Sequence, residues 1–205
     1  MSALFPKHAV IDDAFPAELA DAILARALES EDQFIPTKVS EGTLNDTYRK
    51  SLVHEGGLGE LSKPFRKAVK GLFPDLCKGA GVRPFEVGGL EIQLVAHRDG
   101  HFYKTHSDTF VKNRDRAEAK LVDNRILSLV TYFFRQPAGF TGGETVLYPF
   151  GGEGELPVTP RHNRALAFPS IAPHSVNAIS VPGNAWEDAR FSVNCWFRVA
   201  DTKKS

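Results

Sequence analysis

The second half of the chain is a series of short apolar segments, and this series limits the possible folds more than any other feature. Seven segments rich in Val, Ile, Leu, Phe and Tyr are separated by Gly, Pro or Asn clusters, which is the pattern of short β-strands. They cover residues 85–96, 102–109, 126–134, 145–148, 165–168, 175–181 and 191–199. Many short strands after a helical start predict an α+β chain whose core is a sandwich or an open barrel.

The first part of the chain is predicted to be mainly helical. Apolar residues at helical spacing indicate an amphipathic helix over about 16–30, with Pro16 in the first turn, where proline is tolerated. A second helix is expected over about 58–73, with Pro64 either near its start or kinking it. Residues 8–11 and 48–53 are further strand candidates. We expect one domain over 1–205, in which 1–84 is mainly helical support and 85–200 is the β core.

Composition excludes some classes of function. The formal net charge of the 205 residues is zero and there is no long basic block, so nothing indicates a nucleic-acid partner. The sequence shows no secretory signal and no apolar run long enough for a membrane span. The two cysteines, Cys77 and Cys195, are far apart and are expected to be free thiols in a reducing compartment. A cytoplasmic protein is therefore expected, with its oligomeric state left open.

The segment 102–109 carries His106 and Asp108, which resemble half of a metal site. On an extended strand, residues two positions apart project to the same side, so both side chains can reach one ion. By the same alternation Tyr103 is expected to point away from them. A second His-x-Asp pair, His97 and Asp99, runs into Gly100, and Asp-Gly is a turn signal. We therefore predict the metal at His106 and Asp108, and a turn or bulge over 97–100.

A third ligand has to come from a distant strand, and His174 is the best candidate because it follows Pro173 and opens a predicted strand. The competing histidines are less suitable. His162 lies in a polar segment that is typical of a turn, whereas His8 and His54 precede the β region.

The last strand begins with an arginine on its inward face. Alternation puts Arg190, Ser192 and Asn194 on one face of this strand and the apolar residues between them on the other. An arginine facing the inside of a barrel is costly unless an anion meets it. That anion is either a neighbouring Asp or Glu, or the carboxylate of a bound acid held by the planar guanidinium.

The charged segment 111–124 interrupts the β pattern directly after the predicted metal strand. It is either a solvated loop or short surface helix, or a mobile flap that closes over the site and excludes water.

These features together resemble the Fe(II)- and 2-oxoglutarate-dependent oxygenases, and more closely their prolyl 4-hydroxylase-like branch. The resemblance covers about 94–198 and follows the family's order. Its motifs are Gly100-His-Phe-Tyr-Lys-Thr-His106-Ser-Asp108, Arg125-Ile-Leu-Ser-Leu-Val-Thr-Tyr132, Gly142-Gly-Glu-Thr-Val-Leu-Tyr-Pro149, Arg164-Ala-Leu-Ala-Phe168 and Arg190-Phe-Ser-Val-Asn-Cys-Trp-Phe197. The fold that it implies is a double-stranded β-helix (jelly-roll) core with supporting N-terminal helices.

The resemblance implies a role for each site residue. His106, Asp108 and His174 would be the iron ligands, and Arg190 would bind the distal carboxylate of 2-oxoglutarate. Tyr132 is either a second contact of this cosubstrate or a core aromatic, and Ser192 is a further candidate for the same carboxylate. Trp196 is expected in the core, and Gly142 with Gly143 in a tight turn.

The sequence departs from the branch at two positions. Relatives often carry an aromatic residue near His97, so His97 either lines the pocket or caps a turn. Arg190 follows His174 by 16 residues, which is a longer spacing than is common in this branch and implies a longer loop over 181–188.

The implied reaction consumes O2 and 2-oxoglutarate, releases CO2 and succinate, and hydroxylates an unactivated C–H bond of a prolyl- or amino-acid-type substrate. The carboxylate of Asp108 favours hydroxylation, because halogenating relatives have a small residue there. The substrate is either a small molecule or a peptide. Two alternatives remain: a non-catalytic metal-binding barrel that senses or binds a small ligand, and a zinc hydrolase, for which Glu144 would have to be the general base.

Overall fold

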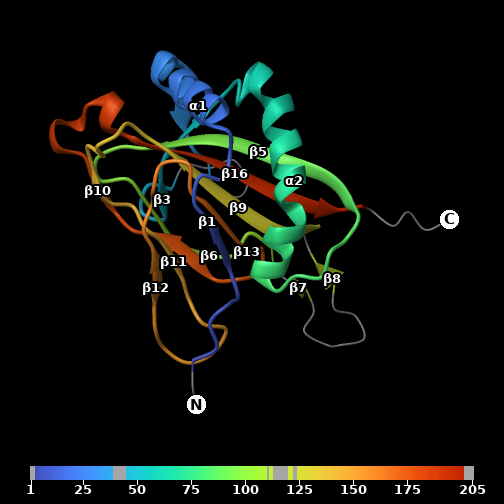
Figure 1. Ribbon diagram of the computed structural model, residues 1–205. Coiled ribbons are helices and arrows are strands. Elements are labelled where there is room, and N and C mark those ends of the chain that lie inside the picture. Colours follow the sequence, from blue (N-terminus) through green and yellow to red (C-terminus); the bar gives the residue numbers. More distant parts are fainter. Residues whose placement is uncertain (1–2, 39–44, 110, 113–119, 122–123, 201–205) are drawn as a thin grey trace.

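In the described residues, the fold consists of two facing antiparallel sheets, two short two-stranded ribbons and two α-helices (Figure 1). The computed structural model describes residues 3–38, 45–109, 111–112, 120–121 and 124–200. The helices are α1 (Ala17–Glu29) and α2 (Ser62–Ala80). The N-terminal strands are β1 (Ala9–Ile11), β2 (Phe34–Pro36), β3 (Arg49–Lys50) and β4 (Leu52–His54). The remaining strands are β5 (Val87–His97), β6 (Phe102–His106), β7 (Val111–Lys112), β8 (Lys120–Leu121), β9 (Arg125–Phe133), β10 (Thr141–Gly142), β11 (Thr145–Leu147), β12 (Leu156–Val158), β13 (Ala165–Pro169), β14 (His174–Val176), β15 (Ile179–Ser180) and β16 (Arg190–Val199).

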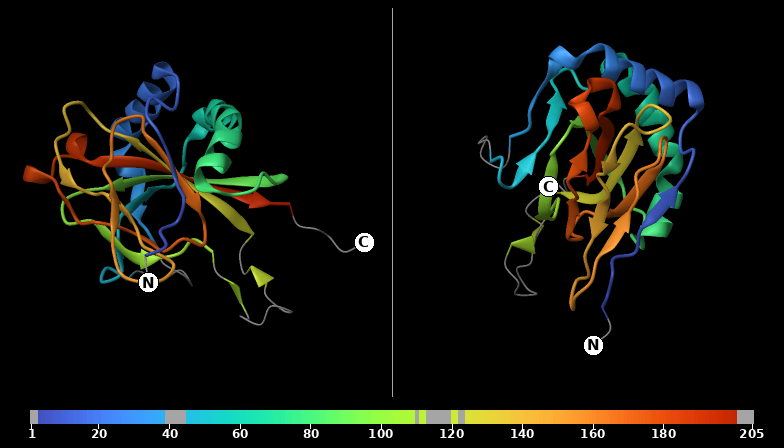
Figure 2. Two further views of the ribbon diagram at one scale, coloured as in Figure 1. Left: turned by 60° about the horizontal axis from the view of Figure 1, so that its bottom comes forward. Right: turned by 90° about the vertical axis from the view of Figure 1, so that its left-hand side faces the viewer.

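The larger sheet has the order β1-β13-β9-β16-β5-β4-β2, and the smaller has the order β12-β11-β14-β6-β3. The two helices lie on one side of β5, β16 and β9, and β6, β11 and β12 lie on the other side (Figures 1 and 2). This is the α+β arrangement with a jelly-roll core that the resemblance implied. Residues 1–84 do more than support it, since they also supply β1, β2 and β4 to the large sheet and β3 to the small one.

Strand β16 shows how the alternation of side chains separates core from cavity. Phe191, Val193 and Cys195 are fully buried in the core that the large sheet shares with the helices. Arg190, Ser192 and Asn194 face the other way and line the cavity between the sheets. The alternation predicted from the sequence is confirmed, because the apolar set has a helix layer to pack against and the polar set does not.

Helix α1 agrees with its prediction, and buries Ala20, Ile23 and Ala27 against the sheet. Helix α2 is displaced from the predicted 58–73. A short 3-10 turn over Gly59–Leu61 precedes it, and Pro64 lies in its first turn, where a missing N–H costs little. It continues past Pro74 to Ala80 and ends where Gly81 adopts a left-handed conformation at φ 65°.

The predicted strand 175–181 is two strands, because its two parts pair in different sheets. β14 lies between β11 and β6, whereas β15 pairs with β10. Cys77 and Cys195 are buried free thiols, as expected. In the described part of the chain, no helix combines the length and apolarity needed to cross a bilayer.

The charged segment after β6 is described only at its ends. Val111 pairs with Leu121 and Lys112 with Lys120, so β7 and β8 form a short antiparallel ribbon. The other residues between them, and hence most of the predicted flap, lie outside the described residues, and the flap stays a prediction.

Candidate active site

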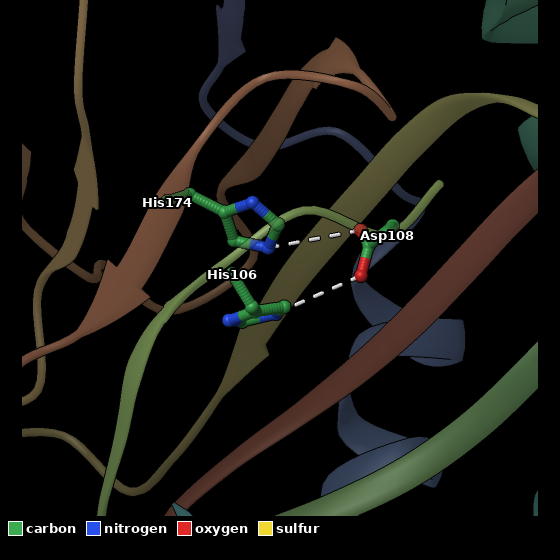
Figure 3. Close-up of side chains that lie close together, drawn as sticks. All are labelled: His106, Asp108 and His174. Carbon is green, nitrogen blue, oxygen red and sulfur yellow. Dashed lines mark ion pairs between the residues drawn. The ribbon is translucent and has the colours of Figure 1, made fainter. Parts of the chain in front are cut away.

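His106, Asp108 and His174 converge in the structure from distant parts of the chain. His106 ends β6 and His174 begins β14, and the two residues are paired across these neighbouring strands. Nε2 of His106 lies 3.7 Å from Oδ1 of Asp108, and Nε2 of His174 lies 3.7 Å from Oδ2. Both imidazoles point towards the carboxylate (Figure 3). One potential ligand atom from each residue lies within 4.8 Å of the others.

Asp108 reaches this cluster by a different route from the one predicted. β6 ends at His106, so Asp108 lies on a bend rather than on the strand. The carbonyl of Ser170 accepts hydrogen bonds from the backbone N–H groups of Asp108 and Thr109, at 2.9 and 3.1 Å. The hydroxyl of Ser128 donates to Oδ2 of Asp108 at 2.6 Å. The carboxylate is therefore held in place by the loop before β14 and by β9.

The two histidines are oriented by their backbone surroundings. Nδ1 of His106 lies 2.9 Å from the carbonyl oxygen of Lys104, and Nδ1 of His174 lies 3.0 Å from that of Ala172. A carbonyl only accepts, so each Nδ1 carries the proton and each Nε2 presents a lone pair towards Asp108.

The charge states of the cluster suit a divalent ion. Burial, with the nearby His174, lowers the pKa of His106 to about 3, so this imidazole is neutral. Burial opposes ionisation of Asp108, but His174, His106 and the hydrogen bond from Ser128 lower its pKa overall. Two imidazoles and one carboxylate on one side form the donor set associated with non-haem Fe(II) sites.

The cluster opens into a cavity of about 360 Å³ between the two sheets. Arg190 lines this cavity and is only 1% exposed. Its Nη2 donates to Nδ1 of His97 at 3.1 Å. Nε and Nη1 of Arg190, and Nε2 of His97, are buried without a hydrogen-bond partner in the structure. Burial lowers the pKa of Arg190, and an anion in this cavity would supply the partner that the buried donors of Arg190 lack.

His97 is the residue whose prediction changes most. It is the last residue of β5, 4% exposed and facing the cavity, and only Arg98 to Gly100 form the turn. Burial, with Arg190 beside it, lowers the pKa of His97 well below its usual value. The neutral ring therefore accepts from Arg190 and lines the pocket, which is one of the two roles considered for it.

The other cosubstrate candidates lie beside Arg190. Tyr132 is fully buried, its ring centroid lies 5.3 Å from Cζ of Arg190, and its hydroxyl donates to Oγ1 of Thr145 at 2.8 Å. Ser192 and Thr145 line the cavity, but Tyr132 does not. Tyr132 can therefore act on a ligand through Thr145, a residue that the sequence gave no reason to single out.

Gly143 supports the same arrangement. It has φ 71°, and a Cβ on it would lie 3.1 Å from Nε of Arg190, so a side chain here would crowd the guanidinium. Gly142 ends β10 and Gly143 follows it without an assigned turn, but both have positive φ, a conformation that favours glycine.

The long connection before Arg190 is anchored rather than loose. Trp186 is 7% exposed, its Nε1 donates to the carbonyl of Ala27 in α1 at 3.1 Å, and its ring packs on Phe34 and Phe191. These contacts return the chain to the large sheet, where Arg190 pairs with His97.

Three further residues line the cavity, although the sequence gave no reason to place them there. Tyr103 was expected to face away, but its ring stacks on that of His106 with centroids 3.5 Å apart. The β6–β14 ladder has an irregularity between its two paired positions, His174 with His106 and Val176 with Tyr103, and a bulge of this kind shifts side chains between faces. Trp196 is buried, as expected, and it also lines the cavity, as does Arg49 from β3.

Glu144 does not take the place that a zinc hydrolase would require. Its carboxylate accepts from Nδ2 of Asn177 at 3.2 Å. Among the described residues that line the cavity, Asp108 is the only carboxylate. The hydrolase alternative therefore lacks its general base.

Comparison with known proteins agrees with this geometry. The family model of the 2OG-Fe(II) oxygenase superfamily matches residues 92–198. An uncharacterized PKHD-type hydroxylase of Synechocystis is 29% identical over 185 residues, which cover 86% of this chain. This chain spans 58% of the length of that relative.

Solved structures share the fold. A prolyl-4-hydroxylase of Pseudomonas putida is similar with a TM-score of 0.67 and 23% identity, over 95% of this chain and 93% of that one. A prolyl hydroxylase of Trichoplax adhaerens, solved with a peptide fragment of the hypoxia inducible factor oxygen degradation domain, has a TM-score of 0.69 and 18% identity, over 94% and 84% of the two chains. At these identities the likeness shows the jelly-roll fold alone.

Proposed function

Because the chain belongs to the 2OG-Fe(II) oxygenase superfamily, whose cofactors are Fe(II), 2-oxoglutarate and O2, we propose that it is a dioxygenase that hydroxylates an unactivated C–H bond. The proposed substrate is of the prolyl or amino-acid type, and CO2 and succinate are the co-products. One observation carries the proposal: the His106, Asp108 and His174 cluster shares a cavity with the unpartnered donors of Arg190.

In this proposal each residue has a defined task. His106, Asp108 and His174 hold Fe(II), and the carbonyls of Lys104 and Ala172 keep both Nε2 lone pairs aimed at the ion. The hydroxyl of Ser128 keeps the Asp108 carboxylate from rotating. When bound, Fe(II) supplies the activation of O2 and of the 2-oxo acid.

Arg190 binds the distal carboxylate of 2-oxoglutarate. Its buried Nε and Nη1 donate to this carboxylate, with Ser192 and the Tyr132–Thr145 pair beside it. A charge-assisted, two-pronged contact fixes the orientation of the acid as well as its affinity.

A non-catalytic metal-binding barrel is the competing function. Such a barrel needs the metal cluster, but it does not need Arg190. A buried arginine without an anionic partner lowers the stability of the fold. The unpartnered donors of Arg190 therefore favour the dioxygenase.

The experiment is a 2-oxoglutarate titration of the anaerobic, Fe(II)-loaded protein, followed by a succinate assay in air. We expect binding of 2-oxoglutarate, at least about 100-fold weaker in Arg190→Ala, because a charge-assisted contact is lost and its partner is left buried. Arg83→Ala is the matched control, since Arg83 is exposed and does not line the cavity. If no succinate formed with any amine or peptide, and Arg190→Ala bound 2-oxoglutarate as tightly as the wild type, the metal-binding barrel would be the better description.

A further inference from the structure

The cavity holds more positive charge than the proposed reaction uses. Lys38, Arg49, Arg125 and Arg190 all line it, and Asp108 is the only carboxylate among its described lining residues. Arg125 is neutralised by a two-pronged ion pair with Glu91, at 2.6 and 3.1 Å. In the loaded site the charges of Fe(II), Asp108, the 2-oxoglutarate dianion and Arg190 cancel. Arg49 and Lys38 then remain as a positive surplus.

Arg49 stands directly beside the metal cluster. Strand β3 pairs with β6, with Arg49 opposite Tyr103, and Cζ of Arg49 lies 4.6 Å from the centroid of the Tyr103 ring. That ring also meets Tyr48 edge-on at 5.6 Å and stacks on the imidazole of His106 at 3.5 Å. The guanidinium, the phenol and the imidazole thus form one stack that ends at the metal cluster.

The guanidinium of Arg49 is held by a hydrogen bond from Nε and lines the cavity. Its Nε donates to the hydroxyl of Ser51 at 2.9 Å, and Ser51 in turn donates to Thr37 at 3.0 Å. No ion pair between described residues involves Arg49. Arg49 lines the cavity beside the metal cluster. Burial lowers the pKa of Arg49, while Tyr103 and Asp108 oppose this shift.

We propose that the substrate carries a carboxylate and that Arg49, assisted by Lys38, binds it. This inference rests on the proposed function and narrows its substrate class to small acids, or to chains that end in a free carboxylate near the reacting carbon. A cavity of about 360 Å³ that must also hold 2-oxoglutarate leaves room for a small group of this kind. Arg49 contacts the ring of Tyr103, and that ring stacks on His106, so a carboxylate bound by Arg49 would lie close to the metal cluster.

The test compares acids with their own amides. The anaerobic protein is loaded with Fe(II) and 2-oxoglutarate, so that Arg190 is already occupied, and binding is measured by calorimetry. The probes are L-proline against L-prolinamide, and the tripeptide Gly-Gly-Pro against its C-terminal amide. The first pair tests a free amino acid and the second a peptide terminus as the source of the carboxylate.

We expect the acid of at least one pair to bind at least about tenfold more tightly than its amide, the usual effect of a charge-assisted hydrogen bond. Arg49→Gln should remove this preference, Arg49→Lys should restore part of it, and the exposed Arg83→Gln should behave as wild type. Melting temperatures check that the variants are folded. Since Arg49 also stacks on Tyr103, a purely structural role would change the melting temperature without changing the acid-to-amide ratio.

Three results would overturn the inference: amides that bind as tightly as acids, no binding by either member of both pairs, or a preference that survives Arg49→Gln. The 2-oxoglutarate titration separates this failure from that of the proposed function. Suppose that one of these three results is found. If wild type and Arg49→Gln then bind 2-oxoglutarate equally well and Arg190→Ala binds it weakly, the proposed function stands and only the substrate inference is lost. If the wild type fails to bind 2-oxoglutarate, the proposed function is lost as well.

Discussion

Arg190 donates a hydrogen bond from Nη2 to Nδ1 of His97 over 3.1 Å, and the two residues are paired across the neighbouring strands β16 and β5. Both are almost fully buried, and the remaining Nε and Nη1 of Arg190 have no partner in the structure. His97 therefore fixes one edge of the guanidinium and leaves the other edge for an anion.

His97→Phe is expected to weaken 2-oxoglutarate binding by about tenfold, because Arg190 loses its acceptor and the pocket loses a buried N–H donor. His97→Gln offers a side-chain oxygen to Arg190 and should recover part of the affinity. Calorimetry on the anaerobic Fe(II)-loaded protein measures both, with His8→Gln, outside the cavity, as the control. Equal affinity in His97→Phe and wild type would remove the positioning role of His97.

Ser128→Ala is expected to lower the affinity for Fe(II) by about 10- to 100-fold, as is typical when the hydrogen-bond partner of a metal-binding carboxylate is removed. The Ser128 hydroxyl donates to Asp108 at 2.6 Å and also contacts the hydroxyl of Ser170 at 2.9 Å. Competition with a chelator under anaerobic conditions measures the affinity, and Ser180→Ala, an exposed serine, is the control. An unchanged affinity would mean that the Ser128 hydroxyl is not needed to position Asp108.

Acid should destabilise the fold in part through His101. Burial, followed by the charge of Lys50, lowers the pKa of His101 from 6.5 to about 4. Between these values the unfolded chain binds a proton that the folded chain does not, so stability falls as the pH drops through this window. From pH 7.5 to 5.5, His101→Asn should lose about 1 kcal/mol less free energy of unfolding than wild type.

Urea unfolding of the metal-free protein at the two pH values measures this difference. Parallel losses in wild type and His101→Asn would show that His101 is already free to protonate in the folded state.

Trp186→Ala should cost about 3–5 kcal/mol of stability, the usual loss for a buried tryptophan. It removes the packing on Phe34 and Phe191 and the hydrogen bond to Ala27. Trp186→Phe keeps most of the packing and should cost less. Because this side chain anchors the loop before Arg190, Trp186→Ala should also weaken 2-oxoglutarate binding, measured by calorimetry at a temperature where the variant is folded. If Trp186→Ala lowered stability but left 2-oxoglutarate binding unchanged, the loop anchored by Trp186 would have no role in positioning Arg190.

Much of the fold follows from local patterns. The alternation over 191–197 was enough to separate the cavity face of β16 from its core face, because one face of this strand packs on helices and the other does not. The helical spacing of apolar residues likewise predicted the position of α1. The extent of α2 was not, because Pro64 and Pro74 are both accommodated within the helix and its end depends on the left-handed conformation of Gly81.

The residues of the site could be predicted from their chemical type and their order in the sequence. The direction in which a side chain points could not be predicted where a strand is irregular. His106, Asp108, His174 and Arg190 were singled out by type and order, and the structure brings all four to one cavity. Tyr103 was put on the wrong side, because strand parity holds only for a regular ladder and the irregularity in the β6–β14 pairing cannot be read from residue spacing.

By itself, the sequence determined the α+β class, the two faces of β16 and the set of side chains able to bind a metal and an anion, because these depend on periodicity and residue chemistry. Only the tertiary structure decided that His97 fixes Arg190, that Ser170 and Ser128 hold Asp108 beyond the end of β6, and that Arg49 stacks beside the metal cluster. Those relationships join residues from different strands and loops, so they arise from sheet pairing and burial over long sequence separations.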